Sequence, residues 1–203
     1  MSLEPSRRRR RVPSPESRGG PLWRVFPWDA GATEGTRYSP SHVPQPTGRG
    51  RFDLPRAVSS VLYTSEAAEH AVSEMLQPWR GRTLDSSQLT RARLPLALVE
   101  VRVAPSSMGR LADLCDPTYL VASGTAPDKT ASRFRHVSQP IARAAWDAGF
   151  HGLRWWSSFW GDWHTVVLFT ARVEGYLTFG APEVLTLDHV AVKKAAELLG
   201  MLA

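Results

Sequence analysis

The stretch 49–74, RGRFDLPRAVSSVLYTSEAAEHAVSE, constrains the fold most because it contains a strand-to-helix junction surrounded by charged and aromatic side chains. Residues 60–63, SVLY, are rich in strand formers and too few for a helix, so they predict a short buried strand. A helix is predicted to follow at once, capped by Thr64 or Ser65. It must end by Pro78, because proline cannot continue a helix.

Three side chains in this stretch are candidates for chemistry, namely Arg51, Tyr63 and Glu74. On the predicted helix, Glu74 shares a face with Ala67 and Ala71, so its carboxylate lies over small side chains that leave room for a ligand. Taken singly, such residues are more often a loop charge, the end of a buried strand and a solvated helix border. Further motifs are needed to assign them a role.

The composition predicts one soluble domain preceded by a charged tail. The chain has 203 residues, of which 42% are hydrophobic and 22% charged, which is ordinary for a globular protein. Of the net charge of +6, residues 1–24 carry +5 and the remainder only +1. The basic charge therefore belongs to the beginning of the chain, and no direct nucleic-acid binding is predicted. We expect a disordered Arg/Pro/Ser-rich tail over 1–20 and a single folded domain over 21–203.

Several classes of site are disfavoured by what the sequence lacks. No apolar run is long enough to cross a bilayer, and the Arg-rich start is not followed by the apolar stretch of an export signal, so we expect a cytoplasmic protein without a membrane span. The single Cys115 rules out an internal disulfide, and His151 and His164 have no partners at metal-ligand spacing, so no metal is predicted. Residues 48–50 do not form a phosphate-binding glycine motif, so side chains would have to hold any nucleotide.

The rest of the chain predicts alternating strands and helices. A first strand over 21–26 carries Arg24 among large apolar residues, and an irregular loop over 27–50 follows. The alternation in 96–103 predicts a half-exposed strand. The further expected elements are a short helical turn at 111–115, loop over 116–136, a helix over 138–148, strands over 151–158 and 165–170, and a closing helix over 188–200 capped by Asp188.

Two spaced motifs resemble those of the RES-domain family, named for its Arg, Glu and Ser. The first consists of Gly50-Arg51-Phe52-Asp53, then Val61-Leu62-Tyr63, then Ala71 to Glu74. The second, Gly-aromatic-x-Gly-Leu-x-aromatic-x-Ser before an apolar strand, places the family's serine at Ser157. The family commonly has proline where this chain has Trp156, so Ser158 stays open as the alternative serine. The resemblance spans roughly Trp23 to Gly200.

The resemblance implies a fold, a substrate and a reaction. RES domains have a mixed fold akin to ADP-ribosyltransferases, which implies an α+β protein with a mixed central sheet flanked by helices. They act on NAD, which implies cleavage of the nicotinamide–ribose bond with inorganic phosphate as acceptor, giving ADP-ribose 1″-phosphate and nicotinamide. NAD would be a substrate, so no cofactor is expected. The site residues implied are catalytic Glu74, Arg51 and Ser157, and substrate-binding Arg24, Tyr63, Trp155, Trp156 and Ser158.

The sequence leaves alternatives open. The same pocket could transfer ADP-ribose to a protein, or the domain could be a non-catalytic module that binds a nucleotide. Trp155 and Trp156 could simply pack, since indoles bury much apolar area. Because family members are mostly toxins of bacterial toxin–antitoxin pairs, the resemblance also implies an antitoxin partner with a helix-turn-helix domain. A homodimer stays open.

Overall fold

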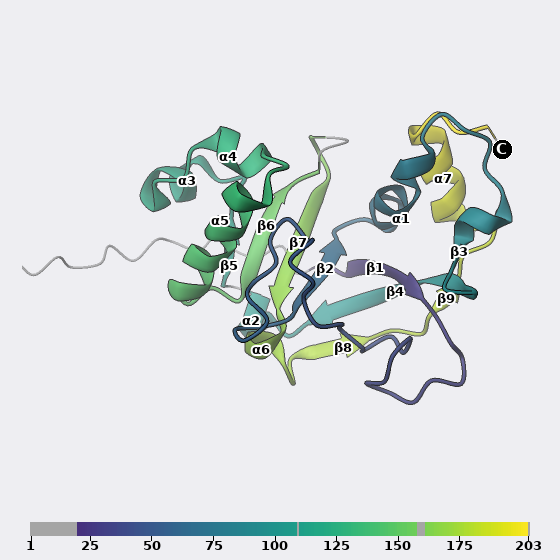
Figure 1. The fold of residues 1–203 in the computed structure, drawn as a ribbon, viewed down its shortest axis with the longest axis horizontal. Helices are drawn as coiled ribbons and strands as arrows, with labels where there is room; N and C mark the ends of the chain where they lie inside the picture. Colours follow the sequence, from purple (N-terminus) through teal and green to yellow (C-terminus); the bar gives the residue numbers. More distant parts are fainter. Residues whose placement is uncertain (1–19, 109, 158–160, 203) are drawn as a thin grey trace, which may run out of the picture.

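A computed structural model describes residues 20–108, 110–157 and 161–202, and it is built on a nine-stranded sheet in the order β3-β4-β1-β2-β7-β6-β5, with β8 and β9 also pairing with β4 (Figure 1). The strands are β1 Leu22–Pro27, β2 Val61–Ser65, β3 Thr90–Arg91, β4 Leu94–Val103, β5 Leu111–Asp113, β6 Gly152–Trp156, β7 His164–Phe169, β8 Leu177–Phe179 and β9 Glu183–Val184. The helices are α1 Ala68–Leu76, α2 Pro105–Met108, α3 Pro117–Ser123, α4 Pro127–Ala131, α5 Arg135–Asp147, α6 Thr170–Val173 and α7 Val190–Leu198. Short 3-10 turns cover Gln77–Trp79 and Ser86–Leu89.

The sheet is mixed, because β5 and β6 run parallel whereas the other described pairs are antiparallel. Helices α1 and α7 lie side by side at one end of the sheet, and α3, α4 and α5 lie at the other (Figure 1). This confirms the predicted α+β class with a mixed central sheet flanked by helices. No helix in the described part of the chain is long and apolar enough to span a membrane.

Pairing within the sheet is weakest between β1 and β2. These strands are paired only at Trp23 and Ser65, whereas β1 pairs with β4 along its whole length and β2 does the same with β7. Beyond that one pair the two strands diverge. The sheet therefore consists of two halves, β1 with β4 and β2 with β7 and β6, that part along one line.

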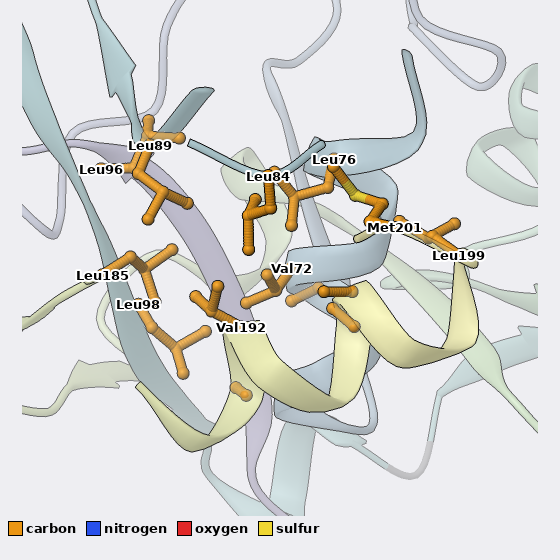
Figure 2. Close-up of a cluster of buried hydrophobic side chains, with 14 residues drawn as sticks. Val72, Leu76, Leu84, Leu89, Leu96, Leu98, Leu185, Val192, Leu199 and Met201 are labelled. Carbon is orange, nitrogen blue, oxygen red and sulfur yellow. The ribbon is translucent and has the colours of Figure 1, made fainter. Parts of the chain in front are cut away.

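Three apolar clusters form the core, and the third joins the two halves of the sheet. In the first, α1 and α7 pack on one face of β1 and β4 (Figure 2). In the second, α3 and α5 pack on β6 and β7. The third fills the opposite side of the sheet, where residues of β1, β2, β4 and β7 meet Val173 of α6. The helical layers thus belong to different halves of the sheet, and the line of separation lies between them.

The predicted half-exposed strand at 96–103 is wrong for most of its length. Leu96 through Val99 are all buried, because Leu96 and Leu98 pack under α1 and α7 while Ala97 and Val99 face the third cluster. Only the far end reaches solvent, where Arg102 pairs with Glu100. Where a sheet is covered on both faces, both sets of alternating side chains are buried, so their alternation does not indicate an exposed face.

The start of α1 also differs from the prediction. Thr64 and Ser65 do not cap the helix, because they are the last residues of β2, and the Thr64 hydroxyl donates to the Val166 carbonyl on β7 at 2.9 Å. Ala67 occupies the capping position and makes no side-chain cap bond. The helix ends at Leu76, before Pro78, as expected.

Other boundaries shift where tertiary contacts override local preference. Residues 111–113 form strand β5 and not a helical turn, because they pair with β6. The predicted loop over 116–136 contains α3 and α4, and α5 begins at Arg135 with Pro140 inside it. The cap of α7 is His189 and not Asp188, which instead pairs with Lys193.

The irregular loop predicted before β2 is confirmed. The predicted tail, apart from Gly20, lies outside the described residues.

Candidate active site

A cavity of about 460 Å³ opens where β1 and β2 part, between the helical layer of α1 and that of α4 and α5. Its volume lies in the range typical of small-molecule sites. The cavity brings together Arg24, Arg51, Tyr63, Glu74 and Trp155 of the residues singled out from the sequence. Its other lining residues are Trp23, Val25, Arg49, Thr64, Ser65, Ala71, Met75, Arg133, Arg135 and Thr165.

Arg51 is presented by a tight turn over Gly50–Asp53. The Tyr63 hydroxyl accepts a hydrogen bond from the Phe52 amide at 3.0 Å and donates one to the Asp53 carboxylate at 3.1 Å. The other carboxylate oxygen of Asp53 accepts from the Gly50 amide at 2.9 Å. Tyr63, at the centre of β2, thus serves as the template on which this turn closes.

Burial and the hydroxyl's partners fix the state of Tyr63. Burial, and then the negative charge of Asp53, raise the pKa of Tyr63 well above its ordinary value of 10.0. The phenol therefore stays protonated at physiological pH and can keep donating to Asp53. Its hydroxyl is already used within the protein, which gives Tyr63 a structural role whatever it contacts in a ligand.

The Arg51 guanidinium is half-buried at the cavity wall. It lies over the rings of Phe52 and Trp155, at 5.2 and 6.0 Å from their centroids, and one terminal nitrogen donates to the Thr130 carbonyl at 2.6 Å. Its Nε atom is buried without a partner among the described residues. Burial lowers the pKa of Arg51 first, and nearby Arg133 lowers it further, whereas Glu74 acts in the opposite direction.

The first turn of α5 fixes the backbone on either side of Arg51. Arg135 Nε donates to the Arg49 carbonyl at 2.9 Å, and the Ser138 hydroxyl donates to the Arg51 carbonyl. The Gln139 amide donates to the carbonyls of Gly48 and Gly50, both at 3.0 Å. Segments about 90 residues apart in the sequence thereby act as one rigid wall.

Glu74 reaches the cavity from α1 on the other side. Its side chain is 44% exposed, so a ligand can contact it, and the fully buried His70 lies one helical turn earlier. His70 Nε2 is 3.3 Å from a Glu74 carboxylate oxygen, and the His70 ring stacks on Trp163 at 4.9 Å. Because an ionised carboxylate can only accept, His70 is the donor and fixes the orientation of Glu74.

Arg24 lines the cavity but is also tied to the irregular loop before β2. Its two terminal nitrogens donate to the carbonyls of Pro40 and His42, at 3.1 and 2.9 Å. Burial lowers the pKa of Arg24 to about 10, so the guanidinium still carries its charge at neutral pH. Arg24 therefore anchors the loop and adds positive charge to the cavity.

The serine motif is only partly assembled at the cavity. Trp155 is buried against Phe52 and Tyr63, whereas Trp156 points to the opposite face of β6 and is not among the lining residues described. Ser157 follows β6 directly and is buried, and its amide donates to the Trp163 carbonyl at 2.7 Å. It also is not among the described lining residues. Ser158 lies outside the described residues.

Sequence reasoning missed Arg133, Arg135 and His70. The two arginines fall in the stretch read as loop, where Arg-Phe-Arg before a helix was the available signal. His70 precedes Glu74 by four residues, and that helical spacing was visible in the sequence. Among the described residues, no group of three His, Cys, Asp or Glu side chains could hold a metal ion.

The fold and the cavity together describe an α+β domain whose split sheet carries a ligand site. The model of the RES domain family matches residues 21–188, so the chain belongs to this family. The fold is similar to a chain in the crystal structure of the M. tuberculosis MbcT–MbcA toxin–antitoxin complex, with a TM-score of 0.58, 17% sequence identity and 90% of each chain covered. No curated protein sequence matches this chain.

Proposed function

We propose that this protein consumes NAD, breaking the bond between nicotinamide and ribose with inorganic phosphate as the acceptor. The observation that carries the proposal is the charge arrangement of the cavity. Glu74 lines it from α1, while Arg49, Arg51, Arg133 and Arg135 line it from the loop and from the α4–α5 side. A dinucleotide that contains a cationic nicotinamide riboside and an anionic pyrophosphate has matching charges.

The residue types suit this chemistry. As the bond from C1″ to the nicotinamide nitrogen breaks, its electron pair neutralises the pyridinium, and the ribose gains oxocarbenium character. A carboxylate near C1″ stabilises a positive charge that is largest in the transition state. Nicotinamide leaves as a neutral molecule and needs no proton donor. A phosphate oxygen then forms the new bond to C1″, giving ADP-ribose 1″-phosphate.

The roles in this proposal follow the geometry. Glu74, oriented by His70, faces the developing positive charge. Arg51 and Arg24 supply positive charge for phosphate or pyrophosphate oxygens, and Trp155 packs beneath the Arg51 guanidinium. Tyr63 builds the turn that carries Arg51. Ser157 belongs to the proposed site through its motif. Trp156 stays a weaker candidate, because it faces away from the described lining residues.

The test is product analysis with purified protein. We expect NAD turnover that requires phosphate, with ADP-ribose 1″-phosphate and nicotinamide identified by mass spectrometry. Glu74→Gln should lower kcat at least about a hundredfold, whereas Glu69→Gln on the same helix should not. Turnover that is independent of phosphate but labels protein would instead support ADP-ribosyl transfer to protein. Absence of turnover in the wild type would support a binding module.

We further infer that the protein is the toxin of a toxin–antitoxin pair. The similar fold in the MbcT–MbcA toxin–antitoxin complex supports this, as does membership of the RES domain family. Its partner would be an antitoxin with a helix-turn-helix domain. Co-expression with the product of the adjacent gene should give a stable complex and suppress NAD consumption, and failure to form one would remove this part of the proposal.

A further inference from the structure

The cavity collects positive charge far beyond what its acid can neutralise. Five arginines line it, namely Arg24, Arg49, Arg51, Arg133 and Arg135, and Glu74 is the only acid among the described lining residues. None of these arginines forms an ion pair with a described carboxylate. Like charges that converge on one cavity repel one another, and Arg133 is among the groups that lower the pKa of Arg51, although burial lowers it more. A bound anion would relieve this repulsion.

Two of these arginines come from a part of the chain that neither motif covers. Arg133 lies between α4 and α5, Arg135 is the first residue of α5, and both line the cavity. The helices α4 and α5 lie at the end of the sheet away from α1 (Figure 1). Arg135 uses Nε to hold the Arg49 carbonyl at 2.9 Å. Its two terminal nitrogens, and the whole Arg133 guanidinium, have no hydrogen-bond partner among the described residues. Their donors are therefore available to a ligand.

The backbone that presents these side chains is fixed before any ligand arrives. The carbonyl of Thr130 in α4 accepts from Arg51, and Ser138 and Gln139 of α5 hold the segment 48–51. Arginine fits such a place because its planar fork donates two parallel hydrogen bonds to phosphate oxygens. Because the backbone is already held, only the arginine side chains have to be ordered when an anion binds.

We propose that Arg133 and Arg135 form, with Arg51, a phosphate-binding wall that holds the ligand by its phosphate oxygens across the cavity from Glu74. The inference rests on the proposed function for the identity of the ligand. The shared chemistry is a phosphate group, which could belong to the pyrophosphate of the dinucleotide or to free inorganic phosphate. The wall would thus select phosphorylated ligands over nucleosides.

Calorimetric titration tests this without turnover. The ligands are inorganic phosphate, ADP-ribose and, as a control without phosphate, adenosine. Arg133→Gln should weaken phosphate or ADP-ribose binding about tenfold or more, and the Arg133→Gln/Arg135→Gln double variant should weaken it further. Arg143→Gln removes the same charge from α5 at a residue outside the cavity, so it should bind like the wild type. Added salt should weaken wild-type binding more than binding by the double variant.

The two ligands distinguish the sources of phosphate. Loss of ADP-ribose binding alone assigns the wall to the pyrophosphate, and loss of inorganic phosphate binding alone assigns it to the acceptor. Binding of both ligands by the double variant with wild-type affinity would overturn the inference. The single variant Arg133→Gln controls for displacement of the loop, because Arg133 makes no described hydrogen bond that the substitution would break. A wild type that binds ADP-ribose but does not consume NAD would overturn the proposed function and leave the wall intact.

Discussion

At the scale of single residues, much of the first motif builds the turn that presents Arg51. A Cβ atom on Gly50 would lie 2.3 Å from the Asp53 carboxylate and 2.4 Å from the Tyr63 hydroxyl, so only glycine lets this turn close. Asp53 and Tyr63 satisfy the amides inside it. Gly50, Asp53 and Tyr63 are therefore needed for geometry, and Arg51 is the member left to face the cavity.

Replacing Tyr63 by phenylalanine tests this structural role. The change removes the acceptor of the Phe52 amide and the donor to Asp53, both inside the protein, so the free energy of unfolding should fall by about 1–3 kcal/mol in urea titrations. Tyr176→Phe, at an exposed tyrosine, should change it little. Unchanged stability together with a large rise in KM for NAD would instead place the hydroxyl on the substrate.

At the scale of elements, a polar network ties three strands to the segment before α1. Arg154 on β6 donates to both carboxylate oxygens of Glu66, at 2.6 and 3.1 Å, and to Asp113 on β5 at 3.1 Å. His164, the first residue of β7, lies 3.3 Å from Glu66. Because α1 has no side-chain cap, this network, together with the bond from the Glu66 amide to the His164 carbonyl, holds the segment from which the helix carrying Glu74 begins.

The network predicts a pH-dependent stability. Burial, and then the charge of Arg154, lower the pKa of His164 below its ordinary value of 6.5. The unfolded chain therefore binds a proton more readily than the folded protein, so stability is full above pH 6.5 and falls as the pH drops below it. Urea unfolding between pH 7.5 and about pH 5 should show this loss.

Substitution of the histidine separates this effect from that of other titrating groups. His164→Gln should reduce the pH dependence and leave the part due to His151, whose pKa is also lowered by burial, whereas His136→Gln at an exposed position on α5 should leave it as in the wild type. An unchanged slope in His164→Gln would show that other groups cause the loss of stability at low pH.

At the scale of the whole molecule, the split in the sheet separates the carboxylate of the cavity from most of its arginines. Glu74 belongs to the layer of α1 and α7, whereas Arg133 and Arg135 of the phosphate-binding wall belong to the layer of α4 and α5, which also holds the segment of Arg51. A ligand that contacts both layers spans the line where β1 and β2 part. Bound ADP-ribose should therefore raise the melting temperature, since it stabilises the folded state alone.

Removing the Arg-rich beginning tests the predicted boundary of the domain. Residues 1–19 hold six arginines and two glutamates with few apolar side chains, a composition that predicts no contribution to the core. A chain that starts at Gly20 should keep its melting temperature to within about 2 °C and its NAD turnover. Calorimetry and the product assay check this, and a clear loss of either would show that the tail belongs to the folded unit.

The sequence alone pointed to the family and to the residues of the first motif, and the resemblance to that family implied the fold class. The motif residues could be recognised because a strand former, a glycine turn and a helical face each depend on spacing within a few residues. The positions of Arg51, Tyr63 and Glu74 on one cavity follow from the strand-to-helix junction that contains them. Even so, the capping role expected of Thr64 was wrong, because sheet pairing extended β2 through it.

Only the tertiary structure decided which distant residues complete the site. Arg133 and Arg135 reach the cavity because α5 packs on β6 and holds the segment 48–51, a contact between positions about 90 residues apart. Strand alternation puts Trp155 and Trp156 on opposite faces, and only packing decided that Trp155 meets Phe52 and Tyr63. Local sequence reports which face a side chain shares with its neighbours, whereas long-range packing decides what lies across from that face.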